Sequence, residues 1–336
     1  MNPTDRVEIG KTGVEVTRLG LGGGPLSGMV LAEGIYGGTG YQQAVSIIRR
    51  AYELGIRYFD TAPMYGEGRS EVRYGRALAD IPRPAFTVST KVARVLDPVP
   101  GEAKPYSEDG IPKMRVSFDF SRSGILRSLE ESLKRLNMQS VEILYLHDSD
   151  FTGQHPESTF REALPALAEL RQQGIVKAIG MGMNQWELTA RCVRDFDLDV
   201  VLMAGRYTLL DQSALPVFMA ECVRRGTRVA IGGPYNSGIL ARDLDGSVTF
   251  DYAPAPRQLI EKARSIKAVC DRHGVDLKAA ALQFVLAHPA VATAIPGAQT
   301  VAEVEQNVAA VKARTPIQLW AELKHEKLIP HDAPVP

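Results

Sequence analysis

Two residues able to exchange protons lie a few positions apart in the segment 57–71. Asp60 ends a short apolar run, and Tyr65 follows in a loop that contains Gly66 and Gly68. A free phenol has a pKa of about 10, so it needs a nearby cation to exchange protons at neutral pH. Asp60 could hold such a cation in place. An ordinary turn, in which Asp60 only caps the following helix, explains this stretch equally well.

Two further apolar runs end in ionisable side chains, Lys91 and His147. A charged group at the end of a buried run costs free energy unless it has partners, so these side chains should face one another. We expect Asp60 to pair with Lys91 and the lysine to stabilise the phenolate of Tyr65, which lowers the pKa of the phenol. His147 would then orient the oxygen of the substrate. Together the four residues predict a proton-transfer site.

Short apolar runs alternate with helical segments along the whole chain. This alternation predicts a parallel sheet that is covered on both faces. Eight such units in a chain of 336 residues predict an α/β fold, a (β/α)8 TIM barrel, in a single domain over 1–336. Active sites of such barrels lie at the carboxyl ends of the strands, where three of the four residues stand. The expected strands are 14–21, 56–60, 86–91, 141–147, 175–180, 200–204, 228–232 and 291–295, and the expected helices are 42–54, 70–79, 121–136, 158–173, 185–195, 213–225, 256–273 and 301–313.

Two segments interrupt the alternation. Residues 93–119 form a long polar loop after the third strand, and residues 277–288 form an extra helix before the eighth strand. Long loops in compact domains are mostly functional or disordered. Because this loop leaves the carboxyl end of a barrel strand, we interpret it as a lid that shapes the substrate site, with a disordered insert as the alternative.

Composition excludes several classes of function. Hydrophobic residues make up 45% of the chain and charged residues 23%, as in a soluble globular protein. Lys+Arg and Asp+Glu each total 39, so no net charge favours nucleic acid or an anionic membrane as a partner. The N-terminus lacks an apolar signal segment, and no window reaches the ~20 apolar residues of a membrane span. Cys192, Cys222 and Cys270 have no CxxC spacing, which favours free thiols, a cytoplasmic protein and no metal site.

The motifs around the four residues resemble those of the aldo-keto reductase superfamily. They are Asp-Thr-Ala-Pro-Met-Tyr-Gly from Asp60, Ser-Thr-Lys ending at Lys91, and Leu-Tyr-Leu-His ending at His147. The superfamily uses an Asp-Tyr-Lys-His tetrad, and all four positions match in order. Residues 204–210 and 232–240 are similar to its sugar-oxidising branch, which holds L-fucose dehydrogenases, D-threo-aldose 1-dehydrogenases and pyridoxal 4-dehydrogenases. The resemblance implies a nicotinamide cofactor that lies extended across the barrel mouth.

The resemblance also implies contacts with this cofactor. Tyr207 matches the aromatic residue that stacks on the nicotinamide ring, with packing at the barrel rim as the alternative. Asn184 matches a ligand of the carboxamide, whereas Ala204 replaces a glutamine that many members use there. The glycines in 20–25 resemble half of a dinucleotide fingerprint, but no helix follows them, so we reject a Rossmann fold. The remaining expected contacts are Gly23, Gly24, Asp60 and a pyrophosphate loop of Gly233, Pro234, Tyr235, Asn236, Ser237, Gly238 and Leu240.

At the adenosine end the residues favour NAD over NADP. Gly297 stands where NADP-preferring reductases carry a lysine, and Glu303 stands where they carry an arginine. A 2′-phosphate would therefore meet a carboxylate in place of a bidentate cation. Glu303 could accept hydrogen bonds from ribose hydroxyls, or it could be an ordinary acidic residue in the first turn of a helix. Gln306 and Asn307 match positions that contact adenine.

These inferences predict an NAD-dependent dehydrogenase that oxidises the anomeric hydroxyl of an aldose, such as L-fucose or a D-threo-aldose, to the lactone. Tyr65 as phenolate would remove the hydroxyl proton, and as phenol it would reduce an aldehyde in the reverse direction. We expect His147, Asp148 and Tyr106 to contact the substrate as well.

Besides a general aldehyde reductase, two alternatives stay open for the function. Pyridoxal could be the substrate, oxidised as its cyclic hemiacetal to 4-pyridoxolactone, although the polar insertion favours a sugar. A non-enzymatic regulatory barrel that only binds the cofactor is the other, and the complete tetrad speaks against it. The expected oligomeric state is a monomer or a small homo-oligomer.

Overall fold

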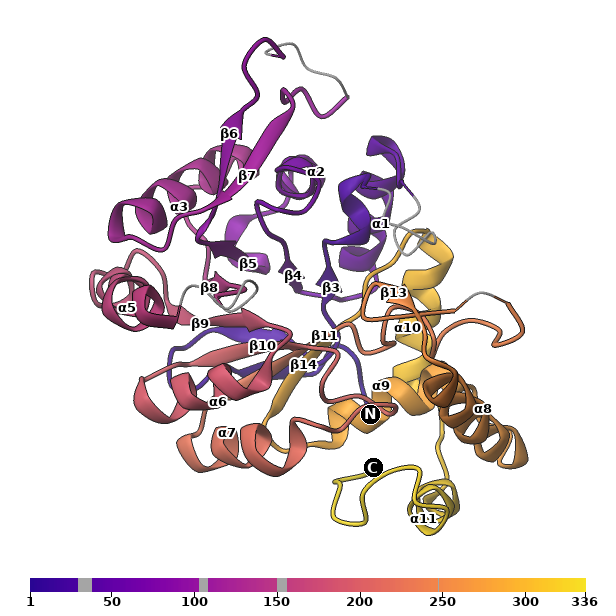
Figure 1. Ribbon diagram of the computed structural model, residues 1–336. Coiled ribbons are helices and arrows are strands. Elements are labelled where there is room, and N and C mark those ends of the chain that lie inside the picture. The colour runs from indigo at the N-terminus through magenta and orange to yellow at the C-terminus, as the bar shows by residue number, and fades with distance from the viewer. Residues whose placement is uncertain (30–37, 103–107, 150–155, 247) are drawn as a thin grey trace.

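Eight parallel strands form a barrel in the computed structural model (Figure 1). The structure describes residues 1–29, 38–102, 108–149, 156–246 and 248–336. The strands follow one another around the barrel in sequence order, and bridges from Leu19 to Ala294 and from Gly22 to Gly297 join the last strand to the first. The predicted (β/α)8 barrel is therefore confirmed. Its strands are β3 (Leu21–Gly22), β4 (Tyr58–Asp60), β5 (Thr87–Val92), β8 (Ile143–His147), β9 (Ala178–Met183), β10 (Val200–Ala204), β11 (Arg228–Gly232) and β14 (Val291–Ile295).

The N-terminal segment departs from the prediction of one strand over 14–21. β2 (Glu15–Thr17) instead pairs antiparallel with β1 (Arg6–Glu8), and only β3 enters the barrel. This hairpin covers the amino-terminal end of the barrel, where the hydroxyl of Thr87 at the start of β5 donates to the carbonyl of Glu15. The apolar run over 14–21 is thus divided between β2 of this hairpin and β3 of the barrel. The cluster inside that end includes Ile9, Val14, Val16, Tyr58, Ile143 and Tyr145.

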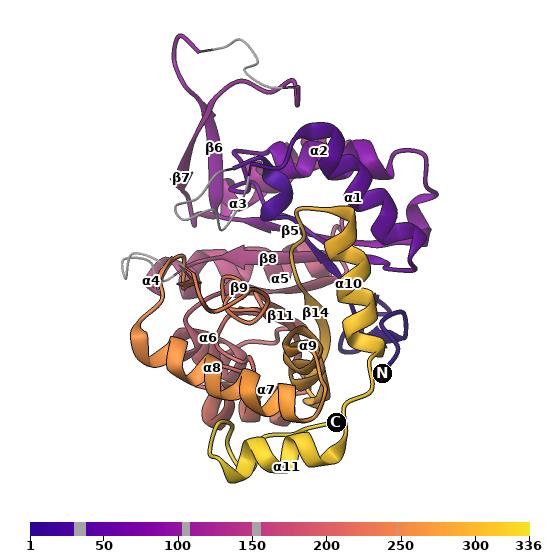
Figure 2. The same cartoon turned by 90° about the vertical axis from the view of Figure 1, so that its right-hand side faces the viewer.

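A ring of helices covers the outside of the barrel (Figure 1, Figure 2). In α1, for example, Ala44, Ile47, Ile48 and Ala51 are buried at the spacing of one helix face, so the apolar stripe faces the strands. The ring comprises α1 (Tyr41–Glu53), α2 (Arg69–Leu78), α3 (Arg122–Leu136), α5 (Leu164–Gln172), α6 (Trp186–Asp195), α7 (Ala220–Arg225), α9 (Leu277–Ala287) and α10 (Val301–Lys312). Shorter elements are η1 (Pro25–Ser27), η3 (Arg83–Ala85), α4 (Pro156–Ser158), η4 (Thr159–Ala163), η5 (Leu215–Met219), β12 (Thr249–Phe250) and β13 (Ala253–Pro254).

Two helices stand between β11 and β14, which confirms the extra helix expected before the last strand. α9 packs against β14 and is buried along almost its whole length, whereas α8 (Arg257–Arg272) lies further out and buries one face. The prediction did not include α11 (Ile317–His325), whose Trp320 packs on Phe284 of α9 with ring centres 6.4 Å apart. Within the described residues, no helix is both long enough and apolar enough to cross a membrane.

The insertion after β5 contains a hairpin, where the sequence predicted a loop over 93–119. β6 (Arg94–Pro98) pairs antiparallel with β7 (Met114–Phe118), and the hairpin projects from the body of the barrel (Figure 2). Each arm is short and the segment between them is polar, which is why no strand was expected. The role of the insertion as a lid stays a prediction, and Tyr106 lies outside the described residues.

The returning limb of the insertion is anchored by a buried ion pair. Arg73 of α2 donates from Nε and Nη2 to the two carboxylate oxygens of Asp109, over 2.6 and 2.9 Å. Their side chains are 4% and 0% exposed. Nη1 of the same arginine donates to the carbonyls of Leu26 and Thr39, each over 2.7 Å. One guanidinium therefore joins α2, the glycine-rich loop after β3 and the insertion, and the single domain over 1–336 stays a prediction.

Close packing of β9 against β10 yields a stability prediction. A Cβ atom on Gly180 would lie 1.6 Å from the carbonyl oxygen of Val200, and that oxygen cannot move away without disturbing the strand pairing. We expect Gly180→Ala to lower the free energy of unfolding by about 3 kcal/mol or more. Gly246→Ala is the control, since a Cβ there meets open space. Urea unfolding followed by circular dichroism measures both variants, and equal stabilities would contradict the prediction.

Candidate active site

The carboxyl ends of β4 and β5 hold a buried ion pair. Nζ of Lys91 lies 2.7 Å from Oδ2 of Asp60 and also donates to the carbonyl of Thr61 over 2.9 Å. The hydroxyl of Ser89 donates to Oδ1 of the carboxylate over 2.7 Å. The side chains of Lys91 and Asp60 are 1% and 2% exposed, so both charges are shielded from solvent. The predicted ion pair between Asp60 and Lys91 is therefore present.

Burial and charge act in opposite directions on Asp60. Burial raises the pKa of its carboxyl, while the ammonium of Lys91 and the hydrogen bond from Ser89 act to lower it. Beneath the pair, the hydroxyl of Tyr58 lies 3.0 Å from both the hydroxyl of Ser89 and that of Tyr145. This hydrogen-bonded support was missed from the sequence. The sequence feature that could have indicated it is that Tyr58 and Tyr145 each lie in a strand that ends in a predicted site residue.

Tyr65 and His147 lie beside this ion pair. Nζ of Lys91 is 4.7 Å from the centre of the Tyr65 ring, and the rings of Tyr65 and His147 meet edge to face with centres 6.0 Å apart. Tyr65 is half-buried in the loop after β4, whereas His147 ends β8 and is buried. The structure thus brings together all four residues that the sequence placed in one proton-transfer site.

The surroundings of His147 favour the uncharged imidazole. Burial lowers the pKa of its imidazole well below the ordinary value, and the cations of Arg94 and Lys91 lower it further. Its Nδ1 finds no hydrogen-bond partner within the part of the chain that the structure describes. A neutral imidazole carries one N–H, which can donate a hydrogen bond to a substrate oxygen.

Asp148 follows His147 and pairs with Arg94, a residue that the sequence analysis did not single out. Nη2 of Arg94 lies 2.5 Å from Oδ2 of Asp148, and that oxygen is 3.4 Å from Nε2 of His147. Burial raises the pKa of the Asp148 carboxyl, while the cations of Arg94 and Lys91 act to lower it. The predicted substrate residues Tyr65, His147 and Asp148 therefore share one end of the barrel mouth. The signal for Arg94 was its place just beyond the end of a barrel strand.

A cavity of about 450 Å³ begins at Asp60 and Tyr65 and extends to α10. Much of its wall comes from the loops after β3, β11 and β14, which contain several glycines. Gly23 shows why small residues are needed, because a Cβ atom there would lie 2.8 Å from the carbonyl oxygen of Asp60. The predicted cofactor residues that line the cavity are Gly23, Gly24, Asp60, Gly233, Pro234, Tyr235, Ser237, Gly238, Gly297, Glu303, Gln306 and Asn307.

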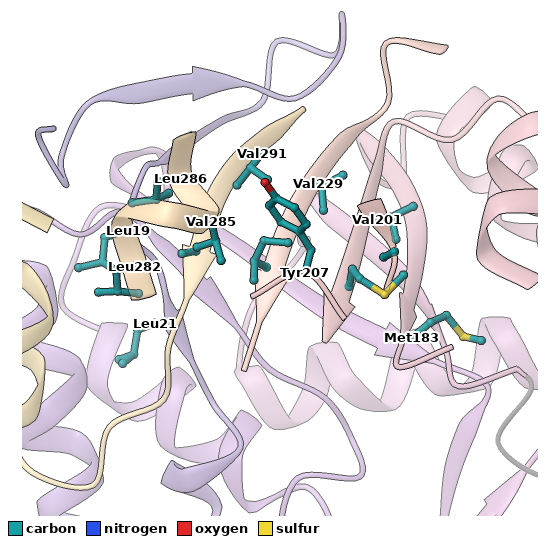
Figure 3. Packing of buried hydrophobic residues seen from close by; sticks show 14 of the residues in the cluster. Leu19, Leu21, Met183, Val201, Tyr207, Val229, Leu282, Val285, Leu286 and Val291 are labelled. Atoms are coloured by element: carbon teal, nitrogen blue, oxygen red, sulfur yellow. The ribbon is translucent and has the colours of Figure 1, made fainter. Parts of the chain in front are cut away.

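Tyr207 lies outside the wall of this cavity, which corrects the prediction that it stacks on a nicotinamide ring. Its side chain is completely buried, and its ring packs on Phe284 and His288 with centres 5.3 and 5.1 Å away. Figure 3 shows it between Val229 and Val291 in the hydrophobic core. Structural packing, the alternative that the sequence left open, describes this residue.

Three other expected cofactor residues also lie outside the cavity wall. Asn236 donates to the carbonyl of Gly205 over 3.0 Å and accepts from the hydroxyl of Thr208, so it braces the loop after β11. Leu240 is fully buried in the core. Asn184 is half-buried just beyond the end of β9. Contact of these residues with a cofactor stays a prediction.

Comparison with known proteins decides the family. The Aldo/keto reductase family matches residues 18–326. The chain belongs to this family. It is 36% identical to the pyridoxal 4-dehydrogenase of Microbacterium luteolum over 98% of this chain and 99% of that protein. It is 38% identical to the D-threo-aldose 1-dehydrogenase of a Pseudomonas species over 86% of this chain and 89% of that protein. An aldo-keto reductase from Bacillus halodurans in its holo form shares the fold, with a TM-score of 0.77, 24% identity, and coverage of 99% and 98%.

This aldo-keto reductase is an oxidoreductase of a family that uses nicotinamide cofactors. Its cavity fits an extended dinucleotide, because one end reaches Tyr65 and the other reaches the first turns of α10. Between them, Gly233 and Gly238 present little side chain, so a pyrophosphate can approach the backbone closely. Near the far end, the hydroxyl of Tyr235 donates to Oδ1 of Asn307 over 2.7 Å and links the loop after β11 to α10.

Gly297 and Glu303 both have a structural role at the α10 end of the cavity. Any side chain at position 297 would collide with Pro25, since a Cβ atom would lie 2.4 Å from its Cγ. Glu303 accepts a hydrogen bond from the backbone N–H of Gln299 over 2.7 Å, so its carboxylate helps to cap α10. This contact agrees with the alternative that Glu303 is an ordinary acidic residue in the first turn of a helix.

The cavity of the aldo-keto reductase also carries cations that the run after β14 did not reveal. Lys278, at the start of α9, lines the far end, and its Nζ donates to Oε1 of Gln306 over 2.7 Å. Arg242, beyond the loop after β11, lines it too. Both residues lie outside the segment 297–303, where the family pattern places phosphate-binding cations. Cations from two other elements reach the same cavity.

The position of Lys91 near the Tyr65 ring predicts a pH effect. Oxidation needs the phenolate, whose negative charge the lysine favours, so the rate of oxidation should rise with pH. In Lys91→Met, the pH at half-maximal kcat/KM should move upward, because the cation is gone. The measurement is a pH profile of oxidation for wild type and variant. The control is Asp60→Asn/Lys91→Met, which avoids an unpaired buried carboxylate and should show the same shift. Profiles that coincide with the wild type would contradict the Lys91–Tyr65 pair.

Proposed function

We propose that this aldo-keto reductase oxidises the anomeric hydroxyl of an aldose to the lactone, with NAD as the cofactor. The observation that carries the proposal is the position of Tyr65 over Lys91, whose charge is paired with Asp60. A hydroxyl group between Tyr65 and His147 would have a base on one side and a hydrogen-bond donor on the other. The hydride from the same carbon would pass to the nicotinamide of the bound cofactor.

Each protein group has a separate role in this proposal. Tyr65 as phenolate takes the hydroxyl proton, and Lys91 favours that form because opposite charges attract at short range. Asp60 keeps the ammonium in place. His147, neutral at physiological pH, donates a hydrogen bond to the reacting oxygen. In the reverse direction Tyr65 returns the proton while an aldehyde is reduced.

Pyridoxal is a second candidate substrate, because the relative named for it matches almost the whole chain. Its cyclic hemiacetal would undergo the same conversion of a hydroxyl to a lactone. The charged pair of Arg94 and Asp148 beside His147 supports a polyol, whose hydroxyl groups can hydrogen-bond to it. The ring of Phe118, 4.9 Å from the guanidinium of Arg94, is an apolar feature that would suit a flat pyridine ring.

A panel of substrates separates these candidates. Purified protein with NAD is given L-fucose, other aldoses of the D-threo series and pyridoxal, and NADH formation is followed by absorbance. We expect turnover of a sugar at a higher kcat/KM than that of pyridoxal. The reverse order would move the assignment to pyridoxal. Absence of any turnover would favour a cofactor-binding regulatory barrel, the rival from a different class of function.

Tyr65→Phe tests the proton-transfer role. We expect kcat to fall by roughly 10²–10⁴-fold, the usual contribution of general acid–base catalysis. NADH binding, measured by fluorescence, should be unchanged because the phenolic hydroxyl alone is removed. A variant that kept most of its kcat would show that another group moves the proton.

The preference for NAD is part of the proposal. Gly297 offers no cation and Glu303 adds a negative charge, so NAD should exceed NADP in kcat/KM by about tenfold or more. Glu303→Gln should raise kcat/KM with NADP several-fold and leave kcat with NAD unchanged, since α10 is remote from Tyr65. The measurement is steady-state kinetics with both cofactors. Comparable values in the wild type would mean that Lys278 or Arg242 binds the 2′-phosphate.

We also propose a cytoplasmic location. The three cysteines are free and buried, and burial raises the pKa of the Cys192 and Cys270 thiols to about 12. Unpaired, unreactive thiols suit a reducing compartment.

A further inference from the structure

Asp148 is held in a strained conformation beside His147. Its φ of 46° lies in the left-handed region, which residues other than glycine rarely adopt. Its backbone N–H donates to the carbonyl of Gly182 in β9 over 3.0 Å, so the neighbouring strand imposes this conformation. Strained backbone of this kind costs free energy and persists where the surroundings fix it. As a result, Oδ2 of the carboxylate lies 3.4 Å from Nε2 of His147, with the side chain only 15% exposed.

Arg94 holds the same carboxylate from the insertion. Nη2 of Arg94 lies 2.5 Å from Oδ2 of Asp148, and the arginine side chain is 5% exposed. The guanidinium also lies over the ring of Phe118 and contacts the sulfur of Met64. Arg94 begins β6 and is the register partner of Phe118 at the end of β7. The base of the hairpin therefore fixes where Asp148 points.

This carboxylate retains capacity to accept another hydrogen bond. The arginine uses Oδ2, and no described residue donates to Oδ1 of Asp148. The carboxylate lies beside His147, with Oδ2 3.4 Å from Nε2, so the two side chains can reach oxygens on neighbouring carbons of one substrate. A substrate whose reacting oxygen lies against His147 would bring the hydroxyl of the adjacent carbon to Asp148.

We propose that Asp148, positioned by Arg94, accepts a hydrogen bond from the hydroxyl next to the reacting carbinol and so selects substrates that carry one. The inference rests on the proposed oxidation and deepens it, because it names the part of the substrate that is recognised. In an aldose this group is the C2 hydroxyl. In the hemiacetal of pyridoxal the counterpart is the ring hydroxyl, which is one carbon further from the carbinol. Asp148 contacts the substrate, and Arg94 is a positioning residue.

A buried carboxylate discriminates strongly against a substrate that leaves it unpaired. The test compares an aldose that the wild type oxidises with its 2-deoxy analogue, by kcat/KM with NAD. For the wild type we expect the analogue to be worse by about tenfold or more. In Asp148→Asn, the ratio of the two kcat/KM values should fall several-fold, because kcat/KM for the hydroxylated sugar decreases. Asparagine tolerates a positive φ, so the backbone at this position is kept.

The double variant Arg94→Met/Asp148→Asn is the decisive one, because it leaves neither charge buried without a partner. Its ratio of kcat/KM for the two sugars should approach one, because the acceptor for the neighbouring hydroxyl is gone. Arg127→Met is the matched control. Arg127 pairs with Asp97 of the same hairpin, and the two side chains are 43% and 32% exposed. Because this pair is exposed, its loss should leave the wild-type ratio unchanged. Circular dichroism and NADH binding confirm that each variant is folded.

Two results would overturn the inference: equal kcat/KM for the two sugars in the wild type, or an unchanged ratio in the double variant. Failure of the proposed sugar activity looks different, because then no aldose yields NADH at all. In that case pyridoxal and its 3-deoxy analogue take the place of the sugar pair. The same loss of discrimination in the double variant would support the inference, and its absence would overturn it.

Discussion

The proposed chemistry depends on one buried pair of opposite charges, Lys91 and Asp60. Taking both groups out of water is costly, and attraction offsets the cost only when geometry is good and the remaining polar atoms are satisfied. Here the carbonyl of Thr61 and the hydroxyl of Ser89 supply those contacts. Because β4 and β5 are adjacent parallel strands, the barrel itself sets the separation of the pair. A cation fixed in this way can act on Tyr65 without reorganisation when the proton moves.

The mouth of the barrel is divided between two kinds of wall. The half towards α10 comes from glycine-containing loops and from α10, and a side chain at Gly23 or Gly297 would collide with its neighbours. The other half, around His147, is lined by charged and polar side chains. This division suits the proposal, because a long cofactor needs close approach along its length, whereas a small substrate is selected by a few directional hydrogen bonds.

The insertion is attached to both halves by buried ion pairs. Arg73 and Asp109 tie its returning limb to the glycine-rich loop, and Arg94 and Asp148 tie its base to the residue beside His147. Buried ion pairs contribute little net stability compared with apolar packing. Breaking one leaves a buried charge without a partner, so each ion pair strongly favours one arrangement. The hairpin thus has a defined position relative to the site, although most of its length projects away from the barrel.

The sequence alone determined that Asp60, Lys91 and His147 would meet. Each ends an apolar run, and in a parallel barrel all strand ends of one sense lie on the same face, so a local pattern was sufficient. Only the tertiary structure decided the course of the first apolar run, since a strand of the barrel and a strand that covers its end bury the same residue types. It also decided the direction of Tyr207, because packing against α9, and not the loop sequence, determines which side of the loop the ring occupies. Lys278 reaches the cavity for the same reason: the docking of α9 on β14 brings together residues that are remote in the chain, and no local pattern records that contact.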